Sequence, residues 1–409
     1  MFLALLLLSV LVPLSTPQCL TPTDRIRPVS TEAHQELLQG ERHFSAKLLQ
    51  TIGNLNPDNN VFISPSSIYK TMLLAYFMSA NHTESALQKS LYLPENKDKL
   101  DLMGAYNLEK YYQKLRSIQK DYQLSSANRI YVDKHVPVKY CMRMLFTDEL
   151  VQANFTMNHI NVLRKINQWV ASQTRKVINN FLSEDSINSQ TQLVLANAAY
   201  FKGKWEKEFP TEDTAEQKFY LNSGTTVPVT MMYQENKFRM IRNAELGIEV
   251  LELPYSGNDI SMFILLPTKT SPSAVPQLLK LLSYETLQKT LVATSSRTPY
   301  KISVTIPKFT VEQTTELTPI LESMGVGDIF EPTANLGTLT GSPVGVSFSD
   351  AIHKAKIQVD EKGTEAAAAT ALVSARIGSE SFIVDHPFVY FLYDKIANII
   401  LFCGIYNSP

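Results

Sequence analysis

Residues 359–376 read Val359-Asp360-Glu361-Lys362-Gly363-Thr364-Glu365-Ala366-Ala367-Ala368-Ala369-Thr370-Ala371-Leu372-Val373-Ser374-Ala375-Arg376. The stretch begins as an alternating strand and, after the Lys362-Gly363 step, consists of small residues. An alanine-rich run usually forms a helix, because alanine is the best helix former. With a period of two, however, one face from Thr364 to Ser374 carries no charge, and Glu365 falls on the other face. Such a segment can be a loop in one state and a central strand in another.

Four further regions extend the pattern along the chain: Asn60-Val61-Phe62-Ile63-Ser64-Pro65-Ser66-Ser67-Ile68; Leu195-Ala196-Asn197-Ala198-Ala199-Tyr200-Phe201-Lys202-Gly203-Lys204-Trp205; Ser349-Asp350-Ala351-Ile352-His353-Lys354; and Asp385-His386-Pro387-Phe388-Val389-Tyr390 with Phe402-Cys403-Gly404. Together with residues 359–376 they resemble the motifs of the serpin family, in the family's order. The resemblance covers roughly residues 38 to 409, and residues 361–381 are similar to the family's reactive-centre loop.

The resemblance implies an α+β serpin fold, with about nine helices around three β-sheets and an exposed loop that inserts into the central sheet. The chain has 409 residues, more than a single domain usually has. The resemblance nevertheless implies one serpin domain over residues 20–409. The 44% content of hydrophobic residues is enough for a large core.

The resemblance also implies roles for particular residues. The loop hinge comprises Glu361, Gly363, Thr364, Ala366, Ala367, Ala368, Ala369 and Thr370. The shutter and breach, which lie under and above the sheet opening, comprise Ser64, Ser67, Asn197, Trp205, Lys308 and His353. A histidine on such a strand is more often structural than catalytic. Lys308 is expected to pair with Glu361 at the top of the sheet, and the alternative is two separately solvated charges.

Two counts place the bond that a protease would attack. Counting back eleven residues from Pro387 gives Arg376, whereas counting seventeen from Glu361 gives Ile377. Both spacings occur in the family. Arginine fits the aspartate-bottomed pocket of trypsin-like proteases, which favours Arg376-Ile377 over Ile377-Gly378.

The N-terminus is typical of a secretory signal. Residues 2–14 are nearly all apolar, small residues follow at Ser15 and Thr16, and the run is too short to span a bilayer. We place the signal peptide at residues 1–19, with an approximate cleavage point, and expect a secreted, extracellular glycoprotein. The sequons at Asn81 and Asn154 are candidate glycosylation sites, of which Asn81 is favoured because it follows a helix.

Cys19, Cys141 and Cys403 are the only cysteines, and three cysteines argue against a disulfide framework. Cys19 is expected to leave with the signal or to lie in a mobile tail. Cys403 lies in an apolar run and is expected to be a buried, unreactive thiol.

No motif for catalysis, metal binding or phosphate binding occurs, so we predict neither enzyme activity nor a metal or cofactor. A net charge of −1 gives no case for nucleic acid. Lys110, Lys114, Arg116 and Lys120 lie at or near helical i, i+4 spacing, and in some serpins this helix binds sulfated glycosaminoglycans. Because Glu109 and Asp121 stand beside them, a solvated face is favoured and the glycosaminoglycan is a secondary prediction.

Apolar periodicity predicts helices at 31–52, 66–78, 102–118 and 162–181. It predicts strands at 126–132, 193–201, 219–232, 248–253, 260–266 and 302–311. At Arg175, where the family commonly has glycine, the local turn geometry is in doubt.

These observations predict a monomeric suicide inhibitor of a trypsin-like serine protease, which traps the acyl-enzyme by loop insertion in an extracellular proteolytic cascade. A non-inhibitory serpin acting as a carrier or chaperone is the alternative. Such members often carry proline or bulky charged residues in the hinge, and this chain does not.

Overall fold

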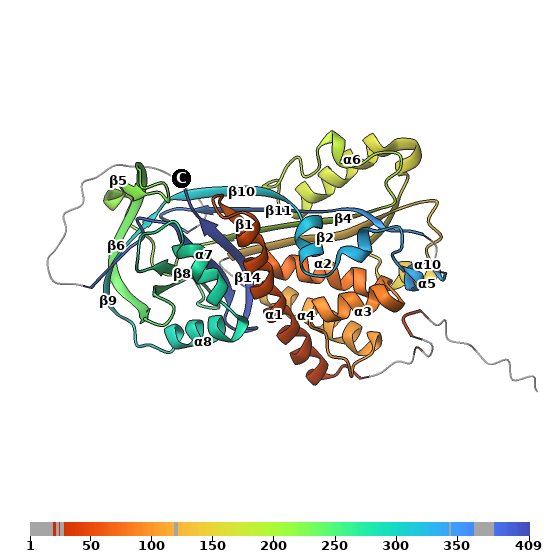
Figure 1. Cartoon of the computed structure of the whole chain (residues 1–409), viewed down its shortest axis with the longest axis horizontal. Helices are drawn as coiled ribbons and strands as arrows, with labels where there is room; N and C mark the ends of the chain where they lie inside the picture. The colour runs from red at the N-terminus through yellow and green to blue at the C-terminus, as the bar shows by residue number, and fades with distance from the viewer. Residues whose placement is uncertain (1–18, 22–23, 25–27, 118–121, 343–344, 364–379) are drawn as a thin grey trace, which may run out of the picture.

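The computed structural model describes residues 19–21, 24, 28–117, 122–342, 345–363 and 380–409. Helices and strands combine in an α+β fold, as the family resemblance implies (Figure 1). None of the helices in these residues has both the length and the apolarity needed to cross a membrane.

A five-stranded sheet carries the residues of the predicted shutter. Its strand order is β10-β11-β4-β2-β3, with bounds Phe309–Glu316, Phe348–Val359, Leu193–Gly203, Tyr122–Asp133 and Leu150–Ala153. The central pair, β11 and β4, is parallel, and so is the edge pair β2 and β3. Strand β10 is antiparallel to β11, and β2 is antiparallel to β4. Strand β4 is buried along almost its whole length, because helices cover both faces of the sheet.

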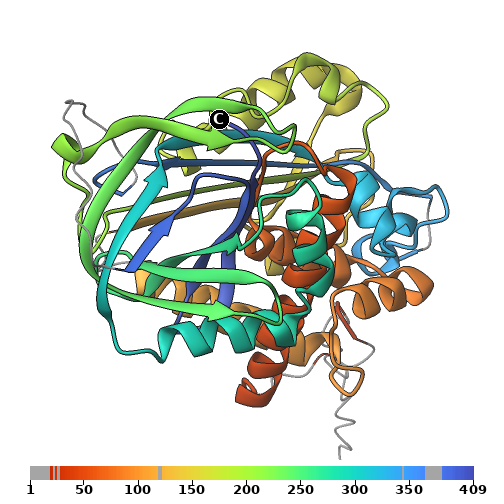
Figure 2. The same ribbon diagram turned by 60° about the vertical axis from the view of Figure 1, so that its left-hand side comes forward.

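A larger sheet curves around the other end of the molecule (Figure 2). Its order is β1-β14-β13-β8-β7-β6-β9-β12, and β5 pairs with β6. The bounds are Val61–Ile63 (β1), Ala215–Tyr220 (β5), Thr226–Asn243 (β6), Ile248–Pro254 (β7), Ile260–Pro267 (β8), Tyr300–Pro307 (β9), Glu380–Ile383 (β12), Phe388–Asp394 (β13) and Ile399–Tyr406 (β14). Two of the three expected sheets are continuous here, because the long strand β6 pairs with β9 through one half and with β7 through the other.

The α-helices in the described residues are α1 (Thr31–Leu55), α2 (Pro65–Met78), α3 (Asn81–Ser90), α4 (Lys99–Ser117), α5 (Tyr140–Leu145), α6 (Phe155–Gln173), α7 (Ala274–Leu281), α8 (Tyr284–Ser295), α9 (Thr318–Ser323) and α10 (Gly337–Thr340). Helix α6 packs on one face of the five-stranded sheet, and α1 to α4 lie on the other side (Figure 1). Helix α2 begins where Ser64 accepts a hydrogen bond from the Ser67 amide and Pro65 occupies the first turn.

Several sequence-based boundaries are wrong, among them the start of α6, which begins at Phe155 rather than at Val162. The predicted strand 219–232 is two strands, β5 and β6, separated by a turn at Gly224. The predicted strand 302–311 divides at Lys308 into β9 and β10, which belong to different sheets. Helix α6 ends at Gln173 rather than near residue 181, because Arg175 and Lys176 adopt left-handed backbone angles, with φ of 52° and 64°. Arg175 therefore occupies a conformation that favours glycine.

The prediction about cysteines is also wrong in part. Cys19 forms a disulfide bond with Cys141 on α5, across a sequence separation of 122 residues. Spacing along the chain gives no sign of this pair, because folding alone brings the two residues together. Cys403 is a buried free thiol, as predicted.

Candidate functional site

The candidate site is the boundary along which the neighbouring strands β11 and β4 pair, and we call this boundary the line between β11 and β4. Eight register pairs join these parallel strands, from Phe348 opposite Leu193 to Lys356 opposite Tyr200. The register pairs end there, whereas β11 continues to Val359 and β4 to Gly203. The turn that starts the predicted hinge closes this upper end, and the opposite end lies beside α5 and α10 (Figure 1).

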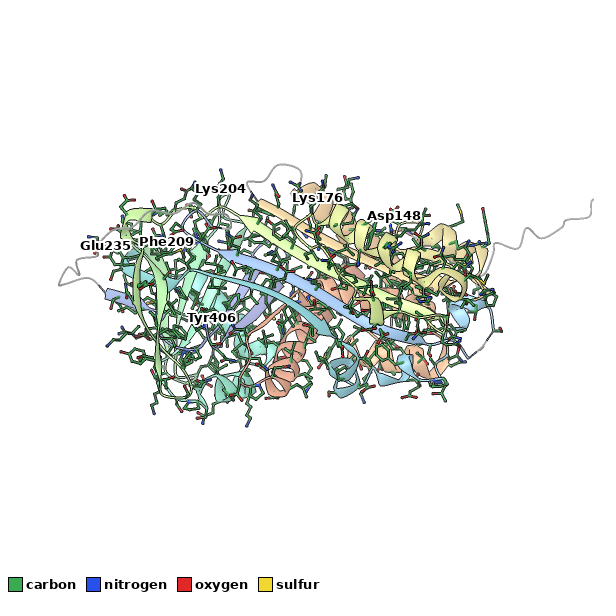
Figure 3. All side chains as sticks on the ribbon, turned by 90° about the horizontal axis from the view of Figure 1, so that it is seen from above. Asp148, Lys176, Lys204, Phe209, Glu235 and Tyr406 are labelled. Carbon is green, nitrogen blue, oxygen red and sulfur yellow. A yellow bond between two sulfur atoms is a disulfide. The ribbon has the colours of Figure 1, made fainter. Side chains whose placement is uncertain are left out.

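Backbone contacts at the upper end fix the base of the predicted loop. Gly363 forms an isolated bridge with Lys204, and the Trp205 amide donates to the Lys362 carbonyl at 3.0 Å. The Trp205 indole Nε1 donates to the Asp360 carbonyl at 2.9 Å. Lys204 stands at this end of the sheet in Figure 3, whereas Asp148 lies toward the other end. The hinge therefore starts directly above the line between β11 and β4.

Only glycine fits at position 363. Its φ is 128°, a left-handed angle that L-residues rarely adopt, and a Cβ placed there would lie 2.1 Å from the Gly203 carbonyl oxygen. Any side chain would push the hinge away from β4. Gly363 therefore permits the close approach of two backbones at the point where a new strand would enter.

The predicted ion pair between Lys308 and Glu361 is present. The Lys308 Nζ lies 2.9 Å from Glu361 Oε2, and the Thr214 hydroxyl donates to Glu361 Oε1 at 3.0 Å. Burial alone would raise the pKa of the Glu361 carboxyl, but the hydrogen bonds from Lys308 and Thr214 hold that pKa below its usual range. An ion pair thus attaches the base of the hinge to the junction between β9 and β10.

A second anchor crosses the line between the strands at mid-sheet. His353 on β11 and Asn197 on β4 are register partners, and His353 Nδ1 is hydrogen bonded to Asn197 Oδ1. The Ser64 amide donates to His353 Nε2 at 3.0 Å. Since Nε2 is an acceptor, Nδ1 carries the proton and donates to Asn197. Complete burial lowers the pKa of His353 to about 3, so the ring is neutral.

The Asn197 amide extends the cluster to α2 and β2. Its Nδ2 donates toward the Ser67 hydroxyl at 2.9 Å, the Thr71 hydroxyl at 2.7 Å and Asn128 Oδ1 at 2.8 Å. Ser67 also contacts Ser126 and Asn128. Sequence reasoning brought Ser64, Ser67, Asn197 and His353 together but missed Thr71, Ser126 and Asn128. The available signal was a group of polar residues, Ser125, Ser126, Asn128 and Arg129, at the start of a predicted strand.

Several predicted residues lie elsewhere. Thr364, Ala366, Ala367, Ala368, Ala369, Thr370, Arg376 and Ile377 fall outside the described residues, as does Lys120. Lys110 pairs with Glu149, and Arg116 pairs with Glu109 and Asp394, so carboxylates neutralise both cations. Asn81 is exposed at the start of α3, and Asn154 caps α6 by accepting from the Met157 amide at 3.0 Å. No group of metal-ligating side chains gathers within the described ranges.

Comparisons with known proteins agree with this geometry. A family model described as "Serpin (serine protease inhibitor)" matches residues 39–409. The chain is 38% identical over 393 residues to "Serine protease inhibitor 88Ea" of Drosophila melanogaster, covering 91% of each chain. It is 33% identical to "Leukocyte elastase inhibitor" of Sus scrofa, covering 92% of this chain and 100% of that protein.

Solved structures give the same result. Uncleaved ovalbumin matches with a TM-score of 0.80 at 28% identity, covering 91% of this chain and 100% of that one. Native protease nexin-1 with heparin matches with a TM-score of 0.78 at 28% identity, covering 92% and 100%. The chain belongs to the serpin family. Its relatives include named protease inhibitors, which supports protease inhibition as its general activity.

The neutral state of His353 predicts a pH dependence. The pKa of His353 is about 3 in the folded protein and 6.5 in a model peptide. As the pH falls, the unfolded chain therefore binds this proton at a higher pH than the folded protein does. The stability that depends on neutral His353 is complete above pH 6.5 and is lost as the pH falls toward 3, at up to about 1.4 kcal/mol per pH unit. The variant His353→Gln should have a shallower decline of melting temperature between pH 6.5 and pH 4, each protein being compared with its own value at pH 7.5. Equal slopes would contradict the assignment.

Proposed function

We propose that the protein is a suicide inhibitor of a trypsin-like serine protease in an extracellular proteolytic cascade. One observation carries the proposal: a small-residue segment begins at Gly363, directly above a parallel strand pair that polar side chains hold together. A strand placed between β11 and β4 would be antiparallel to both. The sheet would then gain a central strand, and the loop would become part of the sheet.

The chemistry is that of an interrupted hydrolysis. The protease serine attacks the carbonyl carbon of Arg376, the bond to Ile377 breaks, and the new amino terminus at Ile377 leaves with a proton from the protease. Deacylation normally proceeds at about 1–10³ per second, so insertion must be comparably fast. Residues 364–376 as a strand would span roughly 40 Å. A displacement of reacting groups by about 1 Å can already reduce a rate 10²-fold. An acyl-enzyme that the inserting strand has carried along the sheet would therefore not hydrolyse.

The choice of Arg376-Ile377 as the reactive bond rests on the sequence. Arginine matches a pocket with aspartate at its base, and Arg376-Ile377-Gly378 resembles the activation bonds of chymotrypsin-fold zymogens. Ile377-Gly378 is the alternative bond. The rival function is a carrier or chaperone of the same family, for which the reactive bond would have no covalent role.

Secretion and glycosylation form part of the same proposal. The apolar leader at residues 2–14 supports export, and a disulfide bond between Cys19 and Cys141 supports an oxidising compartment. Glycans at Asn81 and Asn154 are compatible with their positions at helix starts, since a cap that uses Asn154 Oδ1 leaves its Nδ2 for the sugar.

A sulfated glycosaminoglycan stays a secondary partner. The similarity to protease nexin-1, solved with heparin, supports it. In the described part of α4, however, Lys110 and Arg116 face carboxylates, whereas Lys114 is exposed.

Mixing the protein with a trypsin-like protease should give a covalent complex that resists SDS and should release a peptide that starts at Ile377. Electrophoresis detects the complex, and N-terminal sequencing identifies the bond. A peptide that starts at Gly378 would move the reactive bond to Ile377-Gly378. Absence of a complex with every serine protease tried would favour the carrier function.

Replacing Thr364 with arginine should convert the inhibitor into a substrate. Position 364 directly follows Gly363 on the uncharged face, so it would be the first side chain buried between the strands. Burying an unpaired guanidinium costs at least several kcal/mol, which would slow insertion below deacylation. The matched control is Glu365→Arg, on the opposite face, which should keep inhibition. Equal inhibition by both variants would show that this face does not enter the sheet.

A further inference from the structure

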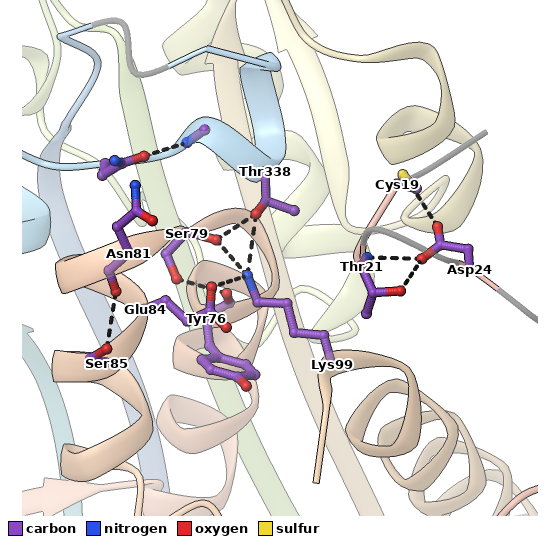
Figure 4. A network of polar contacts seen from close by, with 12 residues as sticks. Cys19, Thr21, Asp24, Tyr76, Ser79, Asn81, Glu84, Ser85, Lys99 and Thr338 are labelled. Carbon is purple, nitrogen blue, oxygen red and sulfur yellow. Dashed lines mark hydrogen bonds and ion pairs between the residues drawn. The ribbon is translucent and has the colours of Figure 1, made fainter. Parts of the chain in front are cut away.

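The N-terminal segment is fastened to α5 by covalent and polar bonds. We call Cys19, Leu20, Thr21 and Asp24, with the disulfide bond to Cys141, the N-terminal clasp. The amides of Cys19 and Thr21 donate to the Asp24 carboxylate at 2.5 and 2.8 Å (Figure 4), and the Leu20 amide donates to it at 3.1 Å. The side chains of Cys19 and Leu20 are buried in the main core. These bonds make the segment part of the folded protein.

The clasp acts on the part of the sheet that insertion must displace. Helix α5 connects β2 to β3, so it belongs to the group β4-β2-β3 on one side of the line between β11 and β4. At the start of α5, the Lys139 Nζ donates to the Cys19 carbonyl at 3.1 Å. The clasp therefore attaches the N-terminal segment to the helix that must move with β2 and β3 when the strands separate.

The same end of the sheet is bound to the other side. The Lys139 amide donates to the Leu339 carbonyl at 2.9 Å, which joins α5 to α10. Helix α10 precedes β11 and is in turn fixed to the end of α2, because the Thr338 hydroxyl donates to the Ser79 carbonyl at 2.6 Å (Figure 4). Lys139 thus contacts both the clasp and α10, and displacement of α5 must strain these contacts together.

We propose that the Cys19–Cys141 disulfide is a redox-sensitive restraint on the opening of the sheet between β11 and β4. The proposal rests on the proposed function, because it concerns the same insertion. With the disulfide closed, α5 cannot leave the N-terminal segment, and the far end of the line between β11 and β4 resists separation. With the disulfide reduced, the N-terminal segment is held to the protein only by the noncovalent contact with Lys139 and by its buried side chains. Spontaneous insertion, which would inactivate the inhibitor, then becomes faster.

The redox step is ordinary thiol–disulfide exchange. A dithiol reductant supplies two electrons and two protons, the bond between the two sulfur atoms breaks, and Cys19 and Cys141 become thiols while the reductant becomes a disulfide. Cys403 does not take part, because it is a buried free thiol and burial raises its pKa. Reduction therefore has a single target among the cysteines.

The proposal also fixes a limit for processing of the leader. The signal peptide that the sequence suggests, residues 1–19, includes Cys19, and its removal would remove the clasp. The clasp requires cleavage on the N-terminal side of Cys19, so the mature chain should contain Cys19 joined to Cys141. Peptide mapping of the secreted protein without reduction should recover this linked pair, and a mature N-terminus at Leu20 or later would overturn the proposal.

Hydrogen exchange of the full secreted protein, with and without dithiothreitol, tests the restraint. Reduction should speed exchange at the amides of β11 and β4 by about ten-fold and lower the melting temperature by several degrees. Cys403→Ser, which keeps the disulfide, should respond to dithiothreitol like the unmodified protein. Cys141→Ser should exchange rapidly with or without it.

Equal exchange in the oxidised and reduced protein would overturn the restraint, whatever the behaviour of the Cys141 variant. This readout needs no protease, so it is separate from the test of inhibition. A protein with redox-dependent exchange that forms no covalent complex with proteases would contradict the proposed function and support the restraint.

Discussion

The hydrogen bond between His353 and Asn197 is the interaction on which the rest of the site depends. It joins register partners on β11 and β4, the two strands that must separate for a new strand to enter. Both side chains are buried and also bind other elements, His353 through the Ser64 amide and Asn197 through Ser67. Breaking the bond leaves buried polar groups without partners, at about 1–3 kcal/mol each. The closed sheet is therefore held by the hydrogen bonds of His353 and Asn197 as well as by packing.

At the base of the loop, a second set of contacts complements these hydrogen bonds. Glu361 is held by Lys308 and Thr214, and Trp205 holds the neighbouring backbone, so residues up to Gly363 are fixed while the strand pair below stays closed. For an inserted strand, ladder hydrogen bonds gain about 0.5–1.5 kcal/mol per residue, and backbone ordering costs about 1–2 kcal/mol per residue. These terms nearly cancel. The net gain must come from burial of side chains such as Leu372 and from completing the sheet.

Sequence patterns predicted the elements whose signal is local. Helices α1 and α2 follow from apolar spacing, and the Lys308–Glu361 pair and the His353–Asn197 contact follow from the family resemblance. What the sequence left out depends on long-range contacts. Asn128 reaches Asn197 from another strand, and Cys19 meets Cys141 across 122 residues. The break between β9 and β10 at Lys308 lies inside one alternating stretch of sequence, and it is the sheet topology that assigns the two halves to different sheets.

The central claim is that the native sheet lacks a strand that the loop can supply. Cleavage of the loop between Ala366 and Arg376 by an unrelated protease frees the segment without forming an acyl-enzyme. Thermal melting of the intact and the nicked protein compares the two states directly. The account predicts that the nicked fragments stay associated and melt at a higher temperature than the intact protein. A melting temperature that is unchanged or lower after nicking would contradict insertion and the inhibitory mechanism with it.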